Sequence, residues 1–444
     1  MVQAILQRLV ISGMVVACAT AVPPSSLGAA PSAAEAPIIW LRVDRAHPRT
    51  VYVGGYRKVL PTCQTRYVYT SACPSWAARS LDGGTSWQSM SGPLDAGQDS
   101  DYARRPHAPY ETLGCYSNPQ PFLVNPDGRH LYAPLKFICG GEAMAGLFGS
   151  RDQGRSWGPL IPADSGSNLT IPCCAAISPL SPGRVFVAEQ VKAHSYGAIQ
   201  NIFMLVSDDG GDHWRRPPHG VYDAPALRSA DTGGLGIVAV VPDPSLLNTL
   251  YLGLIDGTQG KGYPVTWLRS DDAGTTWDSI RVPSGAPGPS HTMLRTDPAF
   301  PGAIEAQPGA EIPHLPATAT KAEGLPTDVQ YVSSDLGQTW RRTLCPGELA
   351  GTCPSTVLYN VFGAGKSFGL FASGVHAFNG SGASGPRLHL ELPVASVVDI
   401  AGGTHYGDPV YVLGPGRSPR SPNAIYRSMD SGRTWRRTAA PAVL

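Results

Sequence analysis

One eight-residue pattern constrains the fold of this chain more than any other feature of its sequence. The pattern, Ser-x-Asp-x-Gly-x-(Ser/Thr)-Trp, occurs six times and contains six of the nine tryptophans, so chance repetition is not a serious explanation. The aspartate and the tryptophan of the successive copies are Asp82 and Trp87, Asp152 and Trp157, Asp209 and Trp214, Asp272 and Trp277, Asp335 and Trp340, and Asp430 and Trp435. Such recurrence predicts one supersecondary unit used repeatedly along the chain.

Each copy of this octet predicts a hairpin turn. The glycine can adopt a positive φ, and the aspartate can accept hydrogen bonds from nearby backbone N–H groups and from the hydroxyl residue, which is His213 in the third copy. The tryptophan then enters the next strand and can bury a large aromatic surface between neighbouring sheets. A catalytic or metal-binding role would need carboxylates spaced 57 to 95 residues apart to meet at one site, so we expect structural roles and no metal site.

A second pattern recurs upstream of the octets. A turn that contains proline is followed by a short strand of β-branched, aromatic and aliphatic residues, and further apolar runs precede the turn. The clearest copies of the strand are Val51–Val53, Leu131–Ala133, Val185–Val187, Leu250–Leu252 and Val410–Val412. Each unit therefore reads as strand, proline turn, strand, loop, strand, octet hairpin and strand. This order predicts a four-stranded antiparallel sheet, the blade of a β-propeller.

The spacing of the octets indicates the number of blades. Successive aspartates are 70, 57, 63, 63 and 95 residues apart, and the last gap has room for a unit without an octet, in residues 356–391. We therefore expect an all-β protein with a single propeller domain over residues 38–444. Seven blades would have about 58 residues each, an ordinary size for this architecture. Six blades with one large insertion is the alternative.

The first 37 residues are typical of an export signal and a tether. Arg8 precedes the apolar run Leu9–Val16, which is too short to span a bilayer, and residues 19–37 are rich in Ala, Pro and Ser. The residues before Cys18 resemble a bacterial lipobox, in which that cysteine is lipidated. This anchor is the one membrane contact we expect, on a protein outside the cytoplasm that is secreted or held at the outer face of the cell membrane.

An ordinary signal peptide is the alternative interpretation of the same segment. Cleavage near Ala21 or Ala30 would discard Cys18, and the protein would then be secreted without a lipid.

The cysteines agree with export. Apart from Cys18 there are eight, an even number, and an exported protein can keep disulfides. Two pairs are close in sequence and could each close a loop: Cys63 with Cys73, and Cys345 with Cys353. The connectivity of the other four stays open: Cys115, Cys139, Cys173 and Cys174. Zinc binding is the rival interpretation, which the lack of any Cys-x-x-Cys pair does not favour.

The octets resemble the Asp box, also called the bacterial neuraminidase (BNR) repeat, and the resemblance covers essentially everything after the tether. Sialidases, sortilin-type receptors, xyloglucanases and a photosystem II assembly factor resemble one another in these boxes while doing different work. The resemblance therefore implies a sialidase-like or sortilin-like propeller, with its boxes on the rim away from a sialidase active site. It carries no catalytic information.

A comparison with the sialidases by residue gives no catalytic site. Those enzymes clamp a substrate carboxylate with three arginines, the first usually in an Arg-Ile-Pro motif at the start of the propeller, and use a tyrosine nucleophile. No Arg-Ile-Pro occurs here, and the corresponding region reads Ile-Ile-Trp-Leu-Arg-Val-Asp over residues 38–44. With this anchor missing, the catalytic residues remain unknown.

The best candidate for ligand recognition is the long connection from Gly92 to Tyr116, which we expect on the face opposite the octet hairpins. It combines cations, aromatic residues and one of only nine glutamates. The candidate ligand-facing residues are Arg104, Arg105, His107, Tyr110, Glu111 and Tyr116. The alternative is a solvated insertion held by Cys115.

The composition of the chain indicates which classes of binding partner to expect. The formal net charge is +1 and 15% of residues are charged, which gives no support for binding DNA or RNA. We expect a monomeric, non-catalytic propeller without a cofactor that binds a protein or a carbohydrate on its face. The alternative is an exo-acting glycoside hydrolase of the sialidase-like superfamily whose active site has diverged.

Overall fold

The computed structural model divides the chain into two compact units, Met1–Ala30 and Pro31–Leu444, and all of the residues it describes belong to the second. The described residues are 38–56, 75–90, 116–117, 123–125, 127–139, 142–161, 169–192, 199–227, 235–256, 265–283, 292–296, 302–308, 329–344, 356–358, 366–371, 374–379, 383–384, 399–403, 407–414, 423–430 and 432–441. Among them, no helix is long and apolar enough to cross a membrane.

The described strands form seven antiparallel sheets, each from one continuous stretch of chain. Blade 1 contains β1 (Ile38–Val43), β2 (Val51–Tyr56), β3 (Ser75–Ser80) and β4 (Gln88–Met90). Blade 2 contains β5 (Tyr116–Ser117), β6 (Leu123–Val124), β7 (Leu131–Cys139), β8 (Glu142–Ser150) and β9 (Gly158–Ile161). Blade 3 contains β10 (Leu169–Ile177), β11 (Val185–Lys192) and β12 (Ile199–Ser207). Blade 4 contains β13 (Leu235–Pro242), β14 (Leu250–Asp256), β15 (Val265–Ser270) and β16 (Asp278–Ile280).

The remaining three blades follow the same order. Blade 5 contains β17 (Thr292–Thr296), β18 (Ile304–Pro308), β19 (Val329–Ser333) and β20 (Arg341–Leu344). Blade 6 contains β21 (Thr356–Leu358), β22 (Lys366–Phe371), β23 (Gly374–Asn379) and β24 (Ala383–Ser384). Blade 7 contains β25 (Asp399–Gly402), β26 (Val410–Gly414), β27 (Ala424–Ser428) and β28 (Arg436–Arg437).

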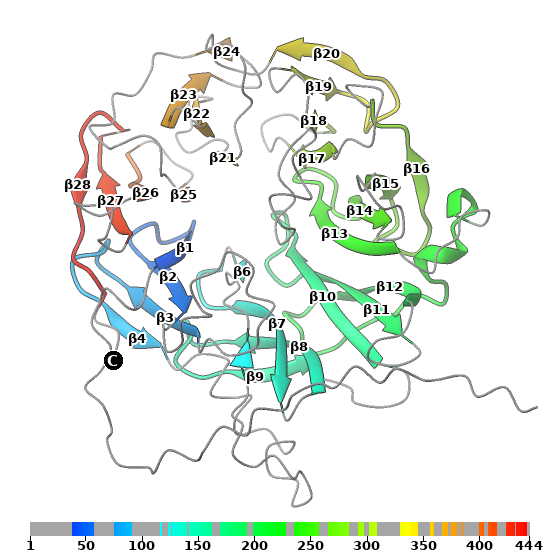
Figure 1. Ribbon diagram of the computed structural model, residues 1–444, viewed down its shortest axis with the longest axis horizontal. Helices are drawn as coiled ribbons and strands as arrows, with labels where there is room; N and C mark the ends of the chain where they lie inside the picture. The colour runs from blue at the N-terminus through cyan, green and yellow to red at the C-terminus, as the bar shows by residue number, and fades with distance from the viewer. Residues whose placement is uncertain are drawn as a thin grey trace, which may run out of the picture. The chain divides into compact units, whose positions relative to one another are not determined.

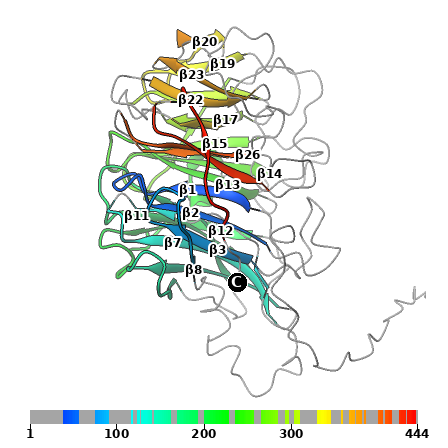
Figure 2. The same cartoon turned by 90° about the vertical axis from the view of Figure 1, so that its left-hand side faces the viewer.

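The predicted all-β propeller is confirmed. Figure 1 shows the sheets following one another around a ring, with blade 7 beside blade 1. Blade 6 is the unit without an octet that the 95-residue gap predicts. Figure 2 shows the blades from the side, with β1, β2 and β3 of the first blade running next to one another.

Two blades depart from the predicted four strands. In blade 2 the inner position is divided, because β6 pairs with one end of β7 and β5 with the other. In blade 3 the outer strand is reduced to a single bridge between Val206 and Arg215. Pro217 and Pro218 follow and have no N–H to donate, so the ladder ends, and the short helices η3 (Val221–Asp223) and η4 (Pro225–Leu227) take its place.

The core lies between blades, because each sheet is apolar on both faces. On β2, Val51 and Val53 pack toward blade 7 while the alternate residue Tyr52 packs toward blade 2, and all three are fully buried. Each octet tryptophan in a described apolar cluster lies at the contact with the preceding blade. These are Trp87, Trp157, Trp214, Trp277 and Trp340.

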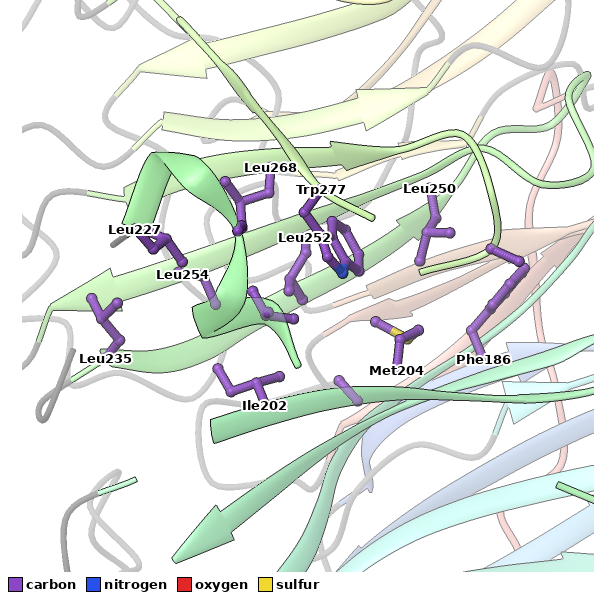
Figure 3. Packing of buried hydrophobic residues seen from close by; sticks show 14 of the residues in the cluster. Phe186, Ile202, Met204, Leu227, Leu235, Leu250, Leu252, Leu254, Leu268 and Trp277 are labelled. Carbon is purple, nitrogen blue, oxygen red and sulfur yellow. The ribbon is translucent and has the colours of Figure 1, made fainter. Parts of the chain in front are cut away.

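The contact between blades 3 and 4 shows this packing in detail (Figure 3). Trp277 is only 4% exposed and lies among Phe186 and Met204 of blade 3 and Leu250 and Leu252 of blade 4. A blade alone would leave these faces in water, so burial of apolar area between neighbours is the main stabilising force of the ring.

Candidate functional site

The antiparallel order of each blade separates its connections onto two faces. The turn between the first two strands and the octet hairpin leave the sheet at one end, which we call the octet face. The loops between the middle strands and the connections between blades leave at the other end, the loop face. On the octet face the two kinds of turn are joined directly: Gly83 N donates to Arg49 O at 2.8 Å, and Ala273 N donates to Asn248 O at 2.8 Å.

The hydrogen bonds of the octet engage the aspartate completely within its hairpin. In the first copy Ser80 Oγ donates to Asp82 Oδ1 at 2.8 Å and accepts from Gly84 N at 2.7 Å, while Ser86 Oγ donates to Asp82 Oδ2 at 2.6 Å. The serine–aspartate, glycine–serine and position-seven bonds recur in the other five copies. These carboxylates are therefore structural parts of the turns.

The same hydrogen bonds keep these carboxylates ionised. The bond from the Ser86 hydroxyl is the main cause that lowers the pKa of Asp82 to about 2. In the third copy the imidazole Nδ1 of His213 replaces the hydroxyl, 2.6 Å from Asp209 Oδ2, and the backbone N–H of His213 is the main cause that lowers the pKa of Asp209 to about 2. A carboxylate with so low a pKa is a poor general acid near neutral pH.

Two features of the structure require glycine at the fifth position of the octet. Its φ is positive in every copy, +89° at Gly274 for example. It also approaches the preceding blade so closely that a Cβ atom at Gly274 would lie 2.5 Å from Met204 Cβ, and one at Gly337 would lie 2.8 Å from Ile280 Cγ2. The octet therefore fixes a turn and a contact between blades at once.

In the five copies in which the structure describes it, the residue before that glycine also has a positive φ, which the sequence pattern did not indicate. It is a glycine in the first and third copies, but Gln153 (+62°), Ala273 (+59°) and Leu336 (+60°) occupy it elsewhere, and these are the non-glycine residues with positive φ in the described part of the chain. Such a backbone is strained for a residue with a Cβ.

Three arginines that sequence reasoning missed connect neighbouring blades. Each directly precedes an octet serine and donates to the backbone carbonyl of the fourth octet residue in the next blade. The bonds run from Arg79 Nη1 to Gln153 O at 2.8 Å, from Arg269 Nη1 to Leu336 O at 3.1 Å, and from Arg427 Nη1 to Gly83 O at 2.8 Å. The recurrence of Arg-Ser before an octet was the available signal.

The candidate ligand loop lies mostly outside the described residues. This applies to Arg104, Arg105, His107, Tyr110 and Glu111. Tyr116 begins β5 and pairs with Ile138, at the end of β7 that is far from the octet hairpin. Tyr116 therefore lies at the inner edge of blade 2, at the end of the blade toward the loop face.

Two arginine–carboxylate pairs lie on the strands themselves. On the inner strands of blades 1 and 7, Asp399 Oδ2 accepts from Arg42 Nη1 at 2.8 Å and from Leu41 N at 3.1 Å. In blade 3, Arg216 Nη2 lies 3.2 Å from Oε2 of the buried Glu189, and its guanidinium carbon lies 3.9 Å from the centre of the Phe203 ring. Both arginines are therefore already paired with a carboxylate of the protein.

The cysteine prediction is tested at one residue. Cys174 has a free thiol, so the expectation that it forms a disulfide is wrong in this structure. It is half-buried and packs against the apolar cluster between blades 3 and 4, as a small apolar side chain would. The side chains of the other candidates lie outside the described residues: Cys63, Cys73, Cys115, Cys139, Cys173, Cys345 and Cys353. Cys18 also lies outside them.

No group of three or more His, Cys, Asp or Glu side chains that could hold a metal ion occurs in the part of the chain that the structure describes.

Comparison with known proteins supports the β-propeller fold and does not identify a function. No protein-family model and no curated protein matches the chain. The chain is similar to the xyloglucanase from Xanthomonas campestris at 15% identity and a TM-score of 0.47, over 90% of this chain and 60% of that one. It is similar to the α-L-arabinanase from Penicillium chrysogenum at 15% identity and a TM-score of 0.40, over 88% and 93% of the two chains.

A third similar structure is prolyl oligopeptidase B from Galerina marginata, at 10% identity and a TM-score of 0.53, over 91% of this chain and 52% of that one. The chain thus spans about 60% of the length of the xyloglucanase and about half that of the oligopeptidase. At these identities the similarity shows the β-propeller fold alone.

Proposed function

We propose that this protein is an exported, non-catalytic propeller of the Asp-box superfamily that binds a protein or a carbohydrate partner on its loop face. The observation that carries the proposal is that the two faces differ. The octet carboxylates are engaged in their own turns, while Tyr116, the last residue of the long connection from Gly92, begins β5 at the inner edge of blade 2, toward the opposite face.

The charged pairs on the strands support a binding role over a sialidase-like one. A sialidase-like site needs arginines that are free to clamp a substrate carboxylate. Arg42 and Arg216 instead face Asp399 and Glu189, and the energy of separating such pairs would oppose their use on a substrate. The same octet network in six copies supports the Asp-box assignment.

The test is a glycan array together with cross-linking to exported proteins, using the full-length protein. The double variant Arg104→Ala, Arg105→Ala should lose the bound glycan or the cross-linked partner. The control is Arg129→Ala, Arg155→Ala, which removes the same charge from exposed positions on the octet face. Equal binding by both variants would contradict the proposed surface.

Hydrolase activity is the competing outcome. Fluorogenic sialosides and plant or bacterial glycans should not be turned over by the wild-type protein. Turnover that a substitution of one central carboxylate abolishes, for example Asp399→Asn, would replace the binding function with a glycoside hydrolase whose site has diverged.

We also propose that Cys18 carries a lipid and that residues 19–37 act as a tether, so that the propeller stays at the outer face of the cell membrane. The support is the sequence alone: a basic residue, a short apolar run and a lipobox-like cysteine.

A further inference from the structure

The octet face carries a groove that has no role in the proposed function. Its volume is about 640 Å³, and it lies between the proline turns of blades 1 and 7, formed by residues 47–50 and 407–409. Leu81 and Met429, the second residues of the first and last octets, complete it together with Gln153. A cavity of this size falls within the range of ordinary ligand sites.

The groove presents one exposed cation, the Arg49 guanidinium. Arg49 is exposed and forms no ion pair with another described residue. His47 directs Nδ1 to the buried carboxylate of Asp44 at 3.0 Å, and the side chain of His47 is 62% exposed. The described lining also holds the half-buried carboxylate of Asp408, which lies over Gly403 within its own turn and has a partner of its own.

The other walls of the groove are apolar. Leu81 and Met429 are each 45% exposed, and they are two of the five large apolar side chains that are exposed among the described residues. The half-buried Pro48 adds further apolar surface, and the buried Pro409 lies behind it in the lining. Exposed apolar side chains that gather in one place mark interaction sites, and a flexible methionine adapts to the shape of an apolar partner.

We propose that this groove binds an extended peptide segment of a partner protein in which an acidic side chain lies between two apolar ones. The Arg49 guanidinium forms a charge-assisted, bidentate pair with the acidic side chain. Leu81 and Met429 receive the flanking apolar side chains. Because this site lies on the octet face, it is a second binding site in addition to the one proposed on the loop face.

The test uses the protein labelled with ¹³C at its methionine methyl groups. The probes are acetyl-Leu-Asp-Leu-amide and the neutral peptide of equal size, acetyl-Leu-Asn-Leu-amide. The Met429 signal should shift saturably with the aspartate peptide, while the signals of the buried Met90 and Met204 stay in place. The asparagine peptide should bind about tenfold more weakly, because it lacks the charge that Arg49 pairs with.

Two matched variants locate the site. Arg49→Gln should weaken the aspartate peptide about tenfold, the loss of one charge-assisted pair. Arg129→Gln is the control, because Arg129 holds the corresponding place in the turn of blade 2, where its carbonyl accepts from Gln153 N as that of Arg49 accepts from Gly83 N. It should leave the affinity unchanged.

An unshifted Met429 signal, equal affinity for the two peptides, or equal effects of the two variants would each overturn the proposal. None of these results bears on the loop face, whose own test uses Arg104 and Arg105.

Discussion

The substitution Trp277→Ala tests the central physical claim, that octet tryptophans stabilise the ring by filling the contacts between blades. Trp277 is 4% exposed, and a buried tryptophan removes about 150–250 Å² from water, equivalent to about 4–6 kcal/mol at about 25 cal/mol per Å². The remaining alanine keeps part of this burial, whereas the lost hydrogen bond from Nε1 to Gly274 O, 3.1 Å long, adds about 1 kcal/mol. We expect a loss of about 3–5 kcal/mol in the free energy of unfolding.

Trp435→Ala is the matched control. Trp435 makes the same hydrogen bond, from Nε1 to Gly432 O at 2.9 Å, but it is only half-buried, so its removal should cost about half as much. The assay is equilibrium urea denaturation followed by far-UV circular dichroism, with the denaturant slope compared between variants. A change within about 0.5 kcal/mol for Trp277→Ala, or equal losses for the two variants, would refute the packing argument.

Four further predictions follow from the structure. Ala273→Gly should change the free energy of unfolding by less than about 1 kcal/mol in the same denaturation assay, because relief of the strain of a φ of +59° opposes the loss of a buried methyl group and the greater entropy of glycine in the unfolded chain; a loss of about 1.5 kcal/mol or more, the cost of the last two effects alone, would contradict this. Asp82→Asn should flatten the loss of stability on acidification. The folded-state pKa of Asp82 is lowered from 3.8 to about 2, so its contribution is complete above pH 4 and disappears as the pH falls toward 2; parallel pH profiles of thermal unfolding for variant and wild type would contradict this. Arg79→Ala should cost about 1.5–3 kcal/mol, because Arg79 is buried and its loss removes the charged donor to Gln153 O; an unchanged urea midpoint would show that this bond between blades is dispensable. Cys18→Ala should abolish labelling by an alkynyl fatty acid in cells, and equal labelling of both forms would exclude lipidation at this residue.

The fold was predictable because the octet carries its own geometry. The Thr276 hydroxyl can donate a hydrogen bond to the Asp272 carboxylate when the chain between them forms a tight hairpin, and Gly274 marks the position with positive φ. The local turn therefore follows from the residue types alone. The blade then follows from the order of apolar strands between the turns, and the missing seventh octet shows as an enlarged spacing.

Features that depend on two blades at once could not be predicted in this way. The bond from Arg427 to Gly83 joins residues 344 apart in the chain, and the recurrent Arg-Ser before an octet does not indicate which residue of the next blade accepts it. The groove near Arg49 likewise needs the relative position of two turns. The missing outer strand of blade 3 had a local signal, Pro217 and Pro218, which the regularity of the repeat obscured.

The junction between blade 7 and blade 1 determines whether the chain can be circularly permuted. Among the described strands, none is exchanged between these two sheets: hydrogen bonds join them from Arg427 to Gly83 O, from Trp87 Nε1 to Ala439 O, and from Ala439 N to Gly84 O. Contacts of this kind do not depend on where the polypeptide starts. A circularly permuted chain, opened between two other blades and linked across this junction, should therefore reach the same native state.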